Sequence, residues 1–405
     1  MDEKDVLRLV DRLKPNLLKL VQELVRIPSE NPPGDERDVA RFLHEKFDEL
    51  GYTVREYEVG RNRANVEARL RGKGGGRSVL FNGHTDVVPA GPRELWSKEP
   101  FGADFDGSRI WGRGTADMKG ALASMVTALQ ALRESGTDLK GDVVVHAVAD
   151  EEANSLGTKY MIEKKLVKAD FAVVGEGSVA NDSIYLRPAV RGICWITLRT
   201  KGKAAHASNP TNGVNAVLGM SKLLLELQSL PIPHKPHRIL PPPTVAPGTT
   251  IRGGIKTNII PPECYAEVDI RNVPGMKETE VVAAIENAAK RIQKENPGIT
   301  AEIVRINWGA SAELPEGHEL LQIASLAAKR VTNVVPALKG GYGTNDSRLL
   351  INHAGVPTLC GFGPGDDTRG NAHAPDENVS LEMLVKFTKI YALMTLWICG
   401  NGRSS

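Results

Sequence analysis

Several side chains that could bind a divalent metal follow short apolar runs of this chain. The run Ser78–Gly83 predicts a buried strand, and the triplet His84-Thr85-Asp86 comes directly after it. Imidazole and carboxylate groups together are typical ligands of divalent metal ions. A surface or capping role is an equally good interpretation of this triplet by itself, so its meaning depends on the rest of the chain.

Acidic residues take the same position after two further apolar runs. Asp150-Glu151-Glu152 follows the run Asp142–Ala149, and Glu176 follows Phe171–Val174. Adjacent acids repel one another unless cations hold them, although a solvated acidic loop is the alternative for such a triplet alone. The carboxyl ends of strands in an open α/β sheet face one crevice, so we expect these side chains to converge. Two further candidates lie in turn-rich loops, Asp117 and His373.

The alternation of strands and helices around these residues predicts an α/β domain with a mostly parallel sheet. This pattern covers residues 1–190 and resumes over 309–405. The expected helices are Lys14–Arg26, Glu36–Leu50, one from Ala116 to about Ser135, Gly157–Lys165, Glu319–Val331, Asn345–His353 and Leu381–Cys399. The expected strands besides the three runs above are Thr53–Val59, Asn65–Arg71 and one near Thr358.

A separate domain is predicted over residues 191–308. Its expected elements are, in order, the strand Ile193–Lys201, the helix Asn215–Leu230, the strands Thr249–Gly254 and Glu263–Ile270, the helix Lys277–Glu295 and the strand Ile299–Asn307. This β-α-β-β-α-β order predicts a four-stranded, ferredoxin-like α+β unit inserted into the larger domain. The proline-rich segment Pro231–Pro243 is expected to be an extended loop.

Length and composition place the chain among globular proteins of two domains. Its 405 residues exceed what one ordinary hydrophobic core organises. Apolar residues make up 41% and charged residues 25%, which is ordinary for a globular protein. The formal net charge of +2 gives no case for a nucleic-acid or membrane partner.

The cysteines and the apolar segments predict a cytoplasmic location. The four cysteines, Cys194, Cys264, Cys360 and Cys399, are widely spaced, so we expect buried free thiols in a reducing compartment. The N-terminal segment lacks the apolar core of a signal peptide. The longest apolar stretch, Ile390–Cys399, is too short to span a bilayer.

Taken together and in order, the motifs resemble those of one enzyme family. They are Pro28-Ser29, His84-Thr85-Asp86, Gly112–Gly120 (GRGTADMKG), Asp150-Glu151-Glu152, Glu176, Gly202–His206 (GKAAH), Asp269-Ile270-Arg271 and Ala372-His373. Over nearly its whole length, the chain resembles the metallopeptidase and deacylase family that includes acetylornithine deacetylase, succinyl-diaminopimelate desuccinylase, aminoacylase-1 and glutamate-releasing carboxypeptidases. The resemblance implies a zinc-peptidase-like catalytic domain of residues 1–190 and 309–405. The inserted domain, 191–308, is implied to be a dimerisation and lid module.

The resemblance also implies a centre of two divalent metal ions, with zinc as the expected metal and cobalt or manganese as substitutes. His84 and Glu176 resemble the ligands of one ion. Glu152 and His373 resemble the ligands of the other. Asp117 resembles the carboxylate that bridges the two ions, and the family implies a cis peptide bond directly after it.

Two further acids resemble residues that act on the reaction without being ligands. Glu151 resembles the general base, and Asp86 resembles the acid that orients His84 and raises its basicity. In such a centre the ions polarise a water, and the base passes the proton of that water to the leaving amine.

The remaining candidates resemble substrate-side residues. Arg271 resembles an arginine that holds a substrate carboxylate, which a guanidinium binds bidentately. His206 resembles a histidine that reaches the partner's active site in a homodimer and donates to the developing oxyanion. Others are Asn258, Thr344, Asn345 and the backbone of Gly363. Considered without the family, surface or turn positions are the alternatives for Arg271, His206, Asn258 and Gly363.

The family resemblance implies an amidohydrolase that deacylates small N-acyl amino acids, similar to acetylornithine deacetylase or succinyl-diaminopimelate desuccinylase. Glu176 in place of aspartate favours that branch over the aminopeptidase branch. A carboxypeptidase or dipeptidase of the same family, which cleaves a short peptide, is the alternative. A relative that binds an amino-acid derivative without turnover is a third, against which the complete ligand set with Glu151 argues. The acyl group and the amino acid stay open.

Overall fold

The computed structural model of this chain describes residues 3–400. Contacts between residues divide the chain into two compact units. The first runs up to Ala189 and resumes over Glu313–Lys339 and from Asn345 onward, and the second comprises Val190–Ala312 and Gly340–Thr344. The boundaries lie close to the predicted ones, except that the sequence placed Gly340–Thr344 in the first domain.

A six-stranded sheet forms the centre of the first unit, in the order β1-β2-β6-β3-β7-β17. Its strands are β1 (Thr53–Gly60), β2 (Arg63–Leu70), β3 (Val79–His84), β6 (Val143–Val148), β7 (Phe171–Val174) and β17 (Thr358–Leu359). The pairs β6–β3, β3–β7 and β7–β17 are parallel, whereas β1–β2 and β2–β6 are antiparallel. Every residue of β3, β6 and β7 is buried, which explains their continuous apolar runs. The predicted mostly parallel sheet is confirmed.

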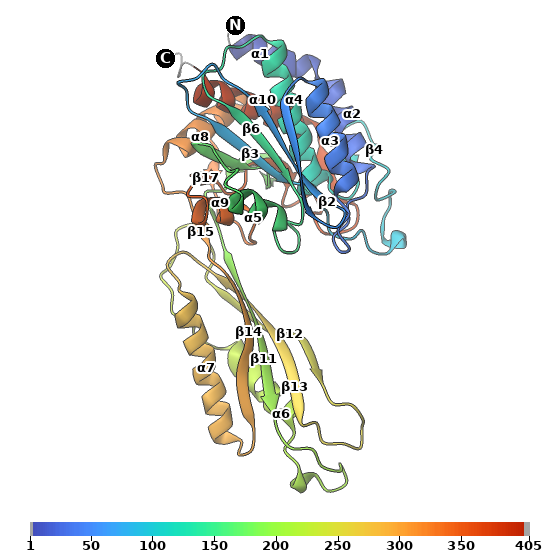
Figure 1. The fold of residues 1–405 in the computed structure, drawn as a ribbon, viewed down its shortest axis with the longest axis vertical. Coiled ribbons are helices and arrows are strands. Elements are labelled where there is room, and N and C mark those ends of the chain that lie inside the picture. Colours follow the sequence, from blue (N-terminus) through green and yellow to red (C-terminus); the bar gives the residue numbers. More distant parts are fainter. Residues whose placement is uncertain (1–2, 401–405) are drawn as a thin grey trace. The chain divides into compact units, whose positions relative to one another are not determined.

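Helices of the first unit lie around this sheet (Figure 1), and most of them contribute buried apolar residues to the core of the unit. They are α1 (Glu3–Arg12), α2 (Lys14–Val25), α3 (Arg37–Glu49), α4 (Gly120–Glu134), α5 (Leu156–Glu163), α8 (Glu319–Thr332), α9 (Ser347–Asn352) and α10 (Leu381–Cys399). In α2, for example, Leu17, Val21 and Leu24 recur at helical spacing and are all buried. Helix α10 is buried nearly all round, and the hydroxyl of Ser380 caps its start.

Short strands, which the sequence did not predict, extend the first unit beside the main sheet. One sheet has the order β16-β9-β8-β18 and another the order β19-β5-β4. Their strands are β4 (Asp104–Phe105), β5 (Arg109–Trp111), β8 (Gly177–Ala180), β9 (Ser183–Leu186), β16 (Ala337–Leu338), β18 (Gly363–Asp366) and β19 (Asn378–Ser380). Strands of two to four residues are too short to show a periodic pattern, which is why they escaped prediction.

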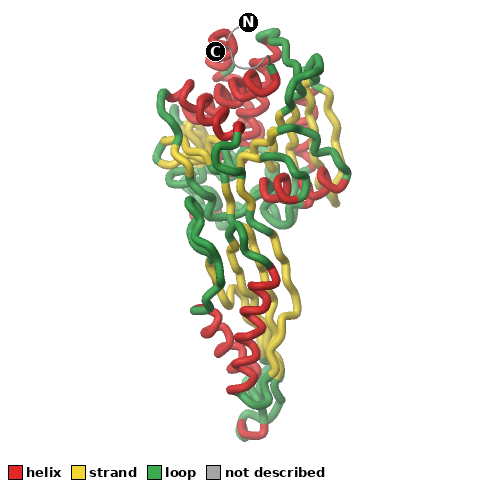
Figure 2. Tube along the Cα trace, turned by 90° about the vertical axis from the view of Figure 1, so that its left-hand side faces the viewer, coloured by secondary structure: helices red, strands yellow, loops and turns green. Residues whose placement is uncertain are grey.

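The second unit consists of a four-stranded antiparallel sheet, β12-β13-β11-β14, with two helices. Its elements are β11 (Gly192–Lys201), α6 (Ala216–Gln228), β12 (Thr244–Gly253), β13 (Glu263–Asn272), α7 (Glu278–Glu295) and β14 (Thr300–Gly309). This is the predicted order. Buried residues alternate along β13, and they pack with α6 and α7, which lie along one face of the sheet (Figure 2).

One predicted element begins late. The sequence predicted a helix from Ala116, but Thr115–Lys119 is an irregular turn in which Asp117 has non-helical angles (φ −132°, ψ 96°). The regular helix α4 begins at Gly120. The late start of the helix leaves Asp117, a candidate metal ligand, in the irregular turn.

The cysteines agree with the sequence, because all four are buried free thiols. None of the helices within residues 3–400 combines the length and apolar character needed to cross a lipid bilayer.

Candidate metal centre

Three neighbouring parallel strands bring most of the predicted ligands to one edge of the main sheet. His84 is the last residue of β3, which lies between β6 and β7. The acidic turn Asp150–Glu152 follows β6, and Glu176 follows β7. Because these strands are parallel, their carboxyl ends share an edge, and the side chains that follow them meet there.

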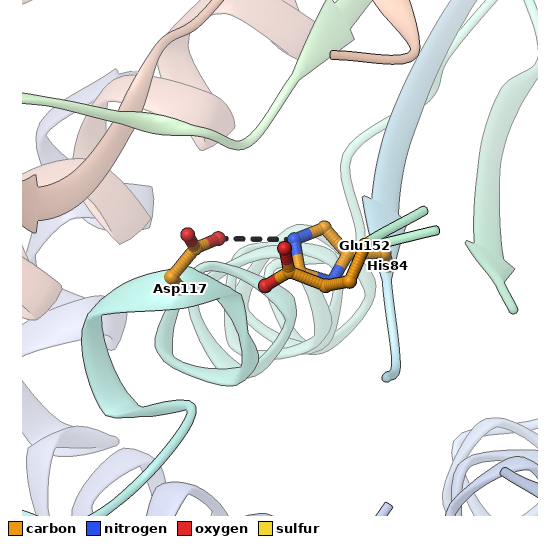
Figure 3. A group of neighbouring side chains, drawn as sticks. All are labelled: His84, Asp117 and Glu152. Atoms are coloured by element: carbon orange, nitrogen blue, oxygen red, sulfur yellow. Dashed lines mark hydrogen bonds and ion pairs between the residues drawn. The ribbon is translucent and has the colours of Figure 1, made fainter. Parts of the chain in front are cut away.

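Asp117 lies between the two histidines of the site. Its Oδ1 is 3.0 Å from Nε2 of His84, and its Oδ2 is 3.2 Å from Nε2 of His373. Oε1 of Glu152 is 3.0 Å from the same His373 nitrogen, and Oε1 of Glu176 is 3.7 Å from Nε2 of His84. Figure 3 shows Asp117, at the turn before α4, facing the imidazole of His84. The two oxygens of one carboxylate thus face two different imidazole–carboxylate pairs.

Two sets of potential ligand atoms are compact enough to hold an ion. The atoms of His84, Asp117 and Glu152 lie within 4.8 Å of one another, and so do those of His84, Glu151 and Glu176. The second set places Glu151, predicted as the general base, beside two predicted ligands of one ion.

Burial and neighbouring charges shift the pKa values of these groups. Burial raises the pKa of Glu151 well above its ordinary value. Burial and then the charge of Asp117 raise the pKa of Glu176 to about 8, and the same two causes raise the pKa of Glu152. Hydrogen bonds to Asp117 and Glu152 raise the pKa of His373 to about 10. The site therefore holds more negative charge than its own histidines can balance.

This donor set fits divalent metal ions. Imidazole nitrogens and carboxylate oxygens are the ligands that zinc and manganese take in mixed sites. Bound cations would also stabilise the charged forms of the buried glutamates, which burial and then mutual repulsion disfavour. The described residues thus form a candidate metal site from the side chains that the sequence predicted.

The turn that contains Asp117 is held by Glu377, which the sequence analysis did not single out. Its Oε2 accepts hydrogen bonds from Nη1 of Arg113 (2.6 Å) and the N–H of Gly114 (2.9 Å). Its Oε1 accepts from the N–H groups of Ala116 (2.9 Å) and Asp117 (3.0 Å). These N–H groups point at a buried carboxylate, which explains why the helix begins only after Asp117. The peptide bond that follows Asp117 is cis, as the family resemblance implied.

Glu377 also joins the two loops that supply Asp117 and His373. It stands in the same short loop as His373, and its carbonyl accepts a hydrogen bond from the N–H of Gly112 at 2.7 Å. In the sequence, Glu377 was visible only as an acid a few residues after the predicted ligand His373. Its hydrogen-bond partners became evident only in the folded chain.

Asp86 acts on the site differently from the prediction. Nδ1 of His84 lies 2.9 Å from the main-chain oxygen of Asp86, whereas the carboxylate Oδ1 is 3.7 Å away. The carboxylate instead accepts hydrogen bonds from the N–H groups of Glu151 and Glu152, each at 3.1 Å. We therefore correct the expected arrangement: the carbonyl of Asp86 orients the imidazole, because its carboxylate is engaged by the acidic turn.

Two residues predicted to bind substrate also make contacts within the fold. Nδ2 of Asn345 donates to the carbonyl of Cys360 at 2.6 Å, and its Oδ1 accepts from the N–H and hydroxyl of Ser347. Gly363 uses both its N–H and its carbonyl with the hydroxyl of Ser178. A Cβ at Gly363 would lie 1.8 Å from a neighbouring main-chain oxygen, so glycine is needed for close packing. The substrate-binding roles of both residues stay predictions.

His206 and Asn258 lie in the second unit and come together there. A β-bridge joins His206 to Ile259, and the N–H of Ala207 donates to the carbonyl of Asn258 at 3.0 Å. Both predicted residues are exposed. Nδ1 of His206 lies 2.7 Å from the hydroxyl of Ser208 and 3.2 Å from its N–H.

Arg271 and Thr344 also belong to the second unit. Nη2 of Arg271 donates to the carboxylate of Asp269, two residues earlier on β13, at 2.9 Å. Oγ1 of Thr344 is buried and has no hydrogen-bond partner within residues 3–400. Their substrate-side roles stay predictions.

Comparison with known proteins agrees with this geometry. Residues 80–396 match the family model described as peptidase family M20/M25/M40. An N-formyl-4-amino-5-aminomethyl-2-methylpyrimidine deformylase from Halalkalibacterium halodurans is 29% identical, with 95% of each chain covered. A succinyl-diaminopimelate desuccinylase from Dinoroseobacter shibae is also 29% identical over 92% of this chain and 96% of that protein. A crystal structure of an M20 family metallo-carboxypeptidase from Sulfolobus solfataricus has a TM-score of 0.79 at 20% identity, covering 94% of this chain and 98% of that chain.

The chain belongs to peptidase family M20/M25/M40, since the family model matches more than half of it. This confirms the family that the motifs indicated. Membership makes the chain a hydrolase of amide bonds, and the structural likeness confirms the fold class.

Metal content tests the central position of Asp117. We expect the zinc-loaded protein to retain two ions per chain after desalting, and Asp117→Ala to retain neither, because each Asp117 oxygen faces a different histidine. Elemental analysis of folded protein measures this, with Asp104→Ala, an exposed acid of β4, as the control. Retention of two ions by Asp117→Ala would remove Asp117 from the centre.

Glu377→Gln tests the support of the Asp117 turn. Breaking a buried ion pair typically costs about 3–5 kcal/mol, because the remaining charge stays buried without its partner. We expect urea unfolding of the first unit at a clearly lower concentration, together with weaker zinc retention. Glu382→Gln, an exposed acid of α10, should behave as wild type. Unfolding of the Glu377→Gln variant at the wild-type midpoint would contradict this role for Glu377.

Proposed function

We propose that this protein is a metal-dependent deacylase of small N-acyl amino acids, with two divalent ions, zinc by preference, in the candidate metal centre. Cobalt or manganese is expected to substitute. The observation that carries the proposal is the carboxylate of Asp117, whose two oxygens face His84 and His373. Family membership and the relatives named as deformylase and desuccinylase support an amide substrate.

In this proposal, His84 and Glu176 would hold one ion, Glu152 and His373 would hold the other, and Asp117 would offer one oxygen to each. Divalent ions bound there would lower the pKa of a water and polarise the scissile carbonyl. Glu151 takes the proton of the attacking water on its carboxylate and delivers it to the nitrogen of the leaving amine. Burial raises the pKa of the Glu151 carboxyl above its ordinary value, a shift common among carboxyl groups that transfer protons.

Substrate orientation is assigned to the second unit. Arg271 is proposed to hold a carboxylate of the substrate, a task that suits a guanidinium. Asn258 and Thr344 are proposed to line the same substrate. We further propose a cytoplasmic homodimer formed through this unit, in which His206 acts on the partner's site. Ser208 engages Nδ1 of His206, which leaves Nε2 as the nitrogen proposed to donate to the oxyanion of the tetrahedral intermediate.

A carboxypeptidase or dipeptidase activity is the second candidate, favoured by the likeness of the fold to the Sulfolobus metallo-carboxypeptidase. The chemistry at the metal centre would be the same for both candidates. They differ in what the scissile amide bond joins to the amino acid, an acyl group for the deacylase and another amino acid for the peptidase. Values of kcat/KM for N-acetylornithine, N-succinyl-diaminopimelate, an N-formyl aminomethylpyrimidine and a set of dipeptides, measured with zinc-loaded protein, separate the candidates. Hydrolysis of dipeptides alone would overturn the deacylase proposal, and no hydrolysis of any of them would overturn both.

Glu151→Gln keeps the shape of the side chain and removes the proton acceptor. We expect kcat to fall by about 10²–10⁴. The zinc content should stay near that of the wild type, because Glu151 is proposed as a base and not as a ligand. Steady-state kinetics and elemental analysis of the same preparation measure both quantities. Loss of zinc would instead mean that Glu151 and Glu152 have exchanged roles.

Mixed dimers test the position of His206. His206→Ala should keep its fold, its dimer and its zinc but lose about 10²–10³ in kcat, the effect of removing one oxyanion donor. In a heterodimer of His206→Ala and Glu151→Gln chains, one site combines an intact Glu151 with the histidine of the other chain. Each such heterodimer should regain up to half of the activity of a wild-type dimer. Mixed dimers that form and stay as inactive as the parent variants would rule out action across the interface.

A further inference from the structure

A buried polar cluster contacts the acidic turn that follows β6, and Asp86 is the member that it shares with the surroundings of His84. Its members come from distant parts of the first unit: Asn31, Glu36, Arg63, Asp86 and Asp150. Four of them are at most 4% exposed, and the side chain of Arg63 is 13% exposed. Arg63 is the first residue of β2, at the hairpin between β1 and β2. We refer to these five residues as the turn-support cluster.

Arg63 makes most of the contacts in the turn-support cluster. Its Nη1 donates to the carboxylate of Asp150 and, at 3.1 Å, to that of Glu36. Its Nη2 donates to Oδ1 of Asn31 at 3.0 Å. The planar guanidinium can serve these three acceptors at once, whereas the ammonium of a lysine would act as a single point charge.

Asn31 extends these contacts to Asp86. Its Nδ2 donates to Oδ2 of Asp86 at 2.9 Å and to Oδ1 of Asp150 at 3.0 Å. The carboxylate of Asp86 in turn accepts from the N–H groups of Glu151 and Glu152. The guanidinium of Arg63 is thus linked, through the amide of Asn31 and the carboxylate of Asp86, to two main-chain N–H groups. These belong to Glu151, the proposed base, and to Glu152, a proposed metal ligand.

Asp150 is the other route from Arg63 to the turn. Its φ of 68° is left-handed, a backbone conformation that needs local support in a residue with a side chain. Its Oδ2 accepts from the N–H groups of Asn154 and Leu156, at 3.2 and 3.3 Å, and so closes the turn. Arg63 and Asn31 hold the other carboxylate oxygen, so both ends of the turn depend on this side chain.

Charge makes Arg63 more than a packing residue. Glu36, Asp86 and Asp150 place acidic groups in one buried region, and burial followed by the charge of Asp86 raises the pKa of Glu36 to about 7. Removing the guanidinium would leave these carboxyl groups buried without its charge, and their repulsion would act directly on the turn.

We propose that Arg63 is a positioning residue for the reaction, which holds Asp150 and Asn31 and thereby fixes the turn that presents Glu151 and Glu152. The proposal rests on the proposed function for the roles of those two glutamates. Partners behind metal ligands typically change metal affinity or activity by about 10–100-fold when they are removed.

Arg63→Ala tests this role, with Arg61→Ala as the matched control, since Arg61 is an exposed arginine in the same hairpin. We expect Arg63→Ala to lower kcat by about 10–100-fold with little change in KM, and to weaken zinc retention against a chelator by a similar factor. Arg61→Ala should match the wild type in both measurements. Thermal unfolding of each variant establishes that the protein compared is folded.

Chemical rescue separates positioning from a general loss of stability. Millimolar guanidinium chloride, far below denaturing concentrations, should enter the vacated space and restore both kcat and zinc retention of Arg63→Ala. The same concentration of sodium chloride should restore neither. Arg63→Lys keeps the positive charge but loses the planar set of donors, so it should recover only part of kcat. If Arg63→Ala does not fold, Arg63→Lys takes its place in the comparison.

Three results would overturn the proposal: wild-type kcat and zinc retention in Arg63→Ala, a loss of activity that only tracks the fraction unfolded, or a folded variant that guanidinium does not rescue. Wild-type values in Arg63→Lys would overturn it as well if the alanine variant does not fold. Zinc retention needs no substrate. If the wild type hydrolysed none of the amides, the proposed function would fail while the zinc measurement still decided the role of Arg63.

Discussion

Negative charge crowded at the ends of three parallel strands is the constraint on which the rest of the structure depends. Asp117, Glu151, Glu152 and Glu176 meet there around His84 and His373, and burial raises the pKa values of the three glutamates. Like charges at such distances separate unless something holds them. The buried carboxylates of Glu377 and Asp86 hold the main chain of Asp117, Glu151 and Glu152 in place, and bound cations would compensate the negative charge.

The residues that support the metal centre, Glu377 and Asp86, hold main-chain groups as well as side chains. Glu377 accepts hydrogen bonds from the turn of Asp117 and delays the start of α4. Asp86 accepts from the turn after β6, while its own carbonyl orients His84. Such contacts set the direction of a ligand before any ion binds, and reactions at metal centres depend on that preorganisation. The second unit is an antiparallel sheet with two helices, and His206 and Asn258 are exposed on it.

The sequence predicted what depends on local pattern and missed what depends on distant partners. Continuous apolar runs revealed β3, β6 and β7, and the ligands followed because side chains after parallel strands must meet. The order of elements in the second unit was equally evident from alternation and helical spacing. The contacts of Glu377 and Asn345 within the fold were not evident, because a carboxylate or an amide in a loop gives no sequence signal for the main-chain groups that it will meet. The close packing of Gly363 was hidden for a similar reason, since its contact arises only in the folded chain.

The most direct test of this account is anomalous diffraction from crystals of the zinc-loaded protein, recorded on both sides of the zinc absorption edge. The account predicts two peaks about 3.5–4 Å apart, the usual spacing of paired metal sites. One peak should lie beside His84 and Glu176 and the other beside Glu152 and His373, with one oxygen of Asp117 directed at each. A single peak, or peaks that leave Asp117 without contact to both ions, would contradict it.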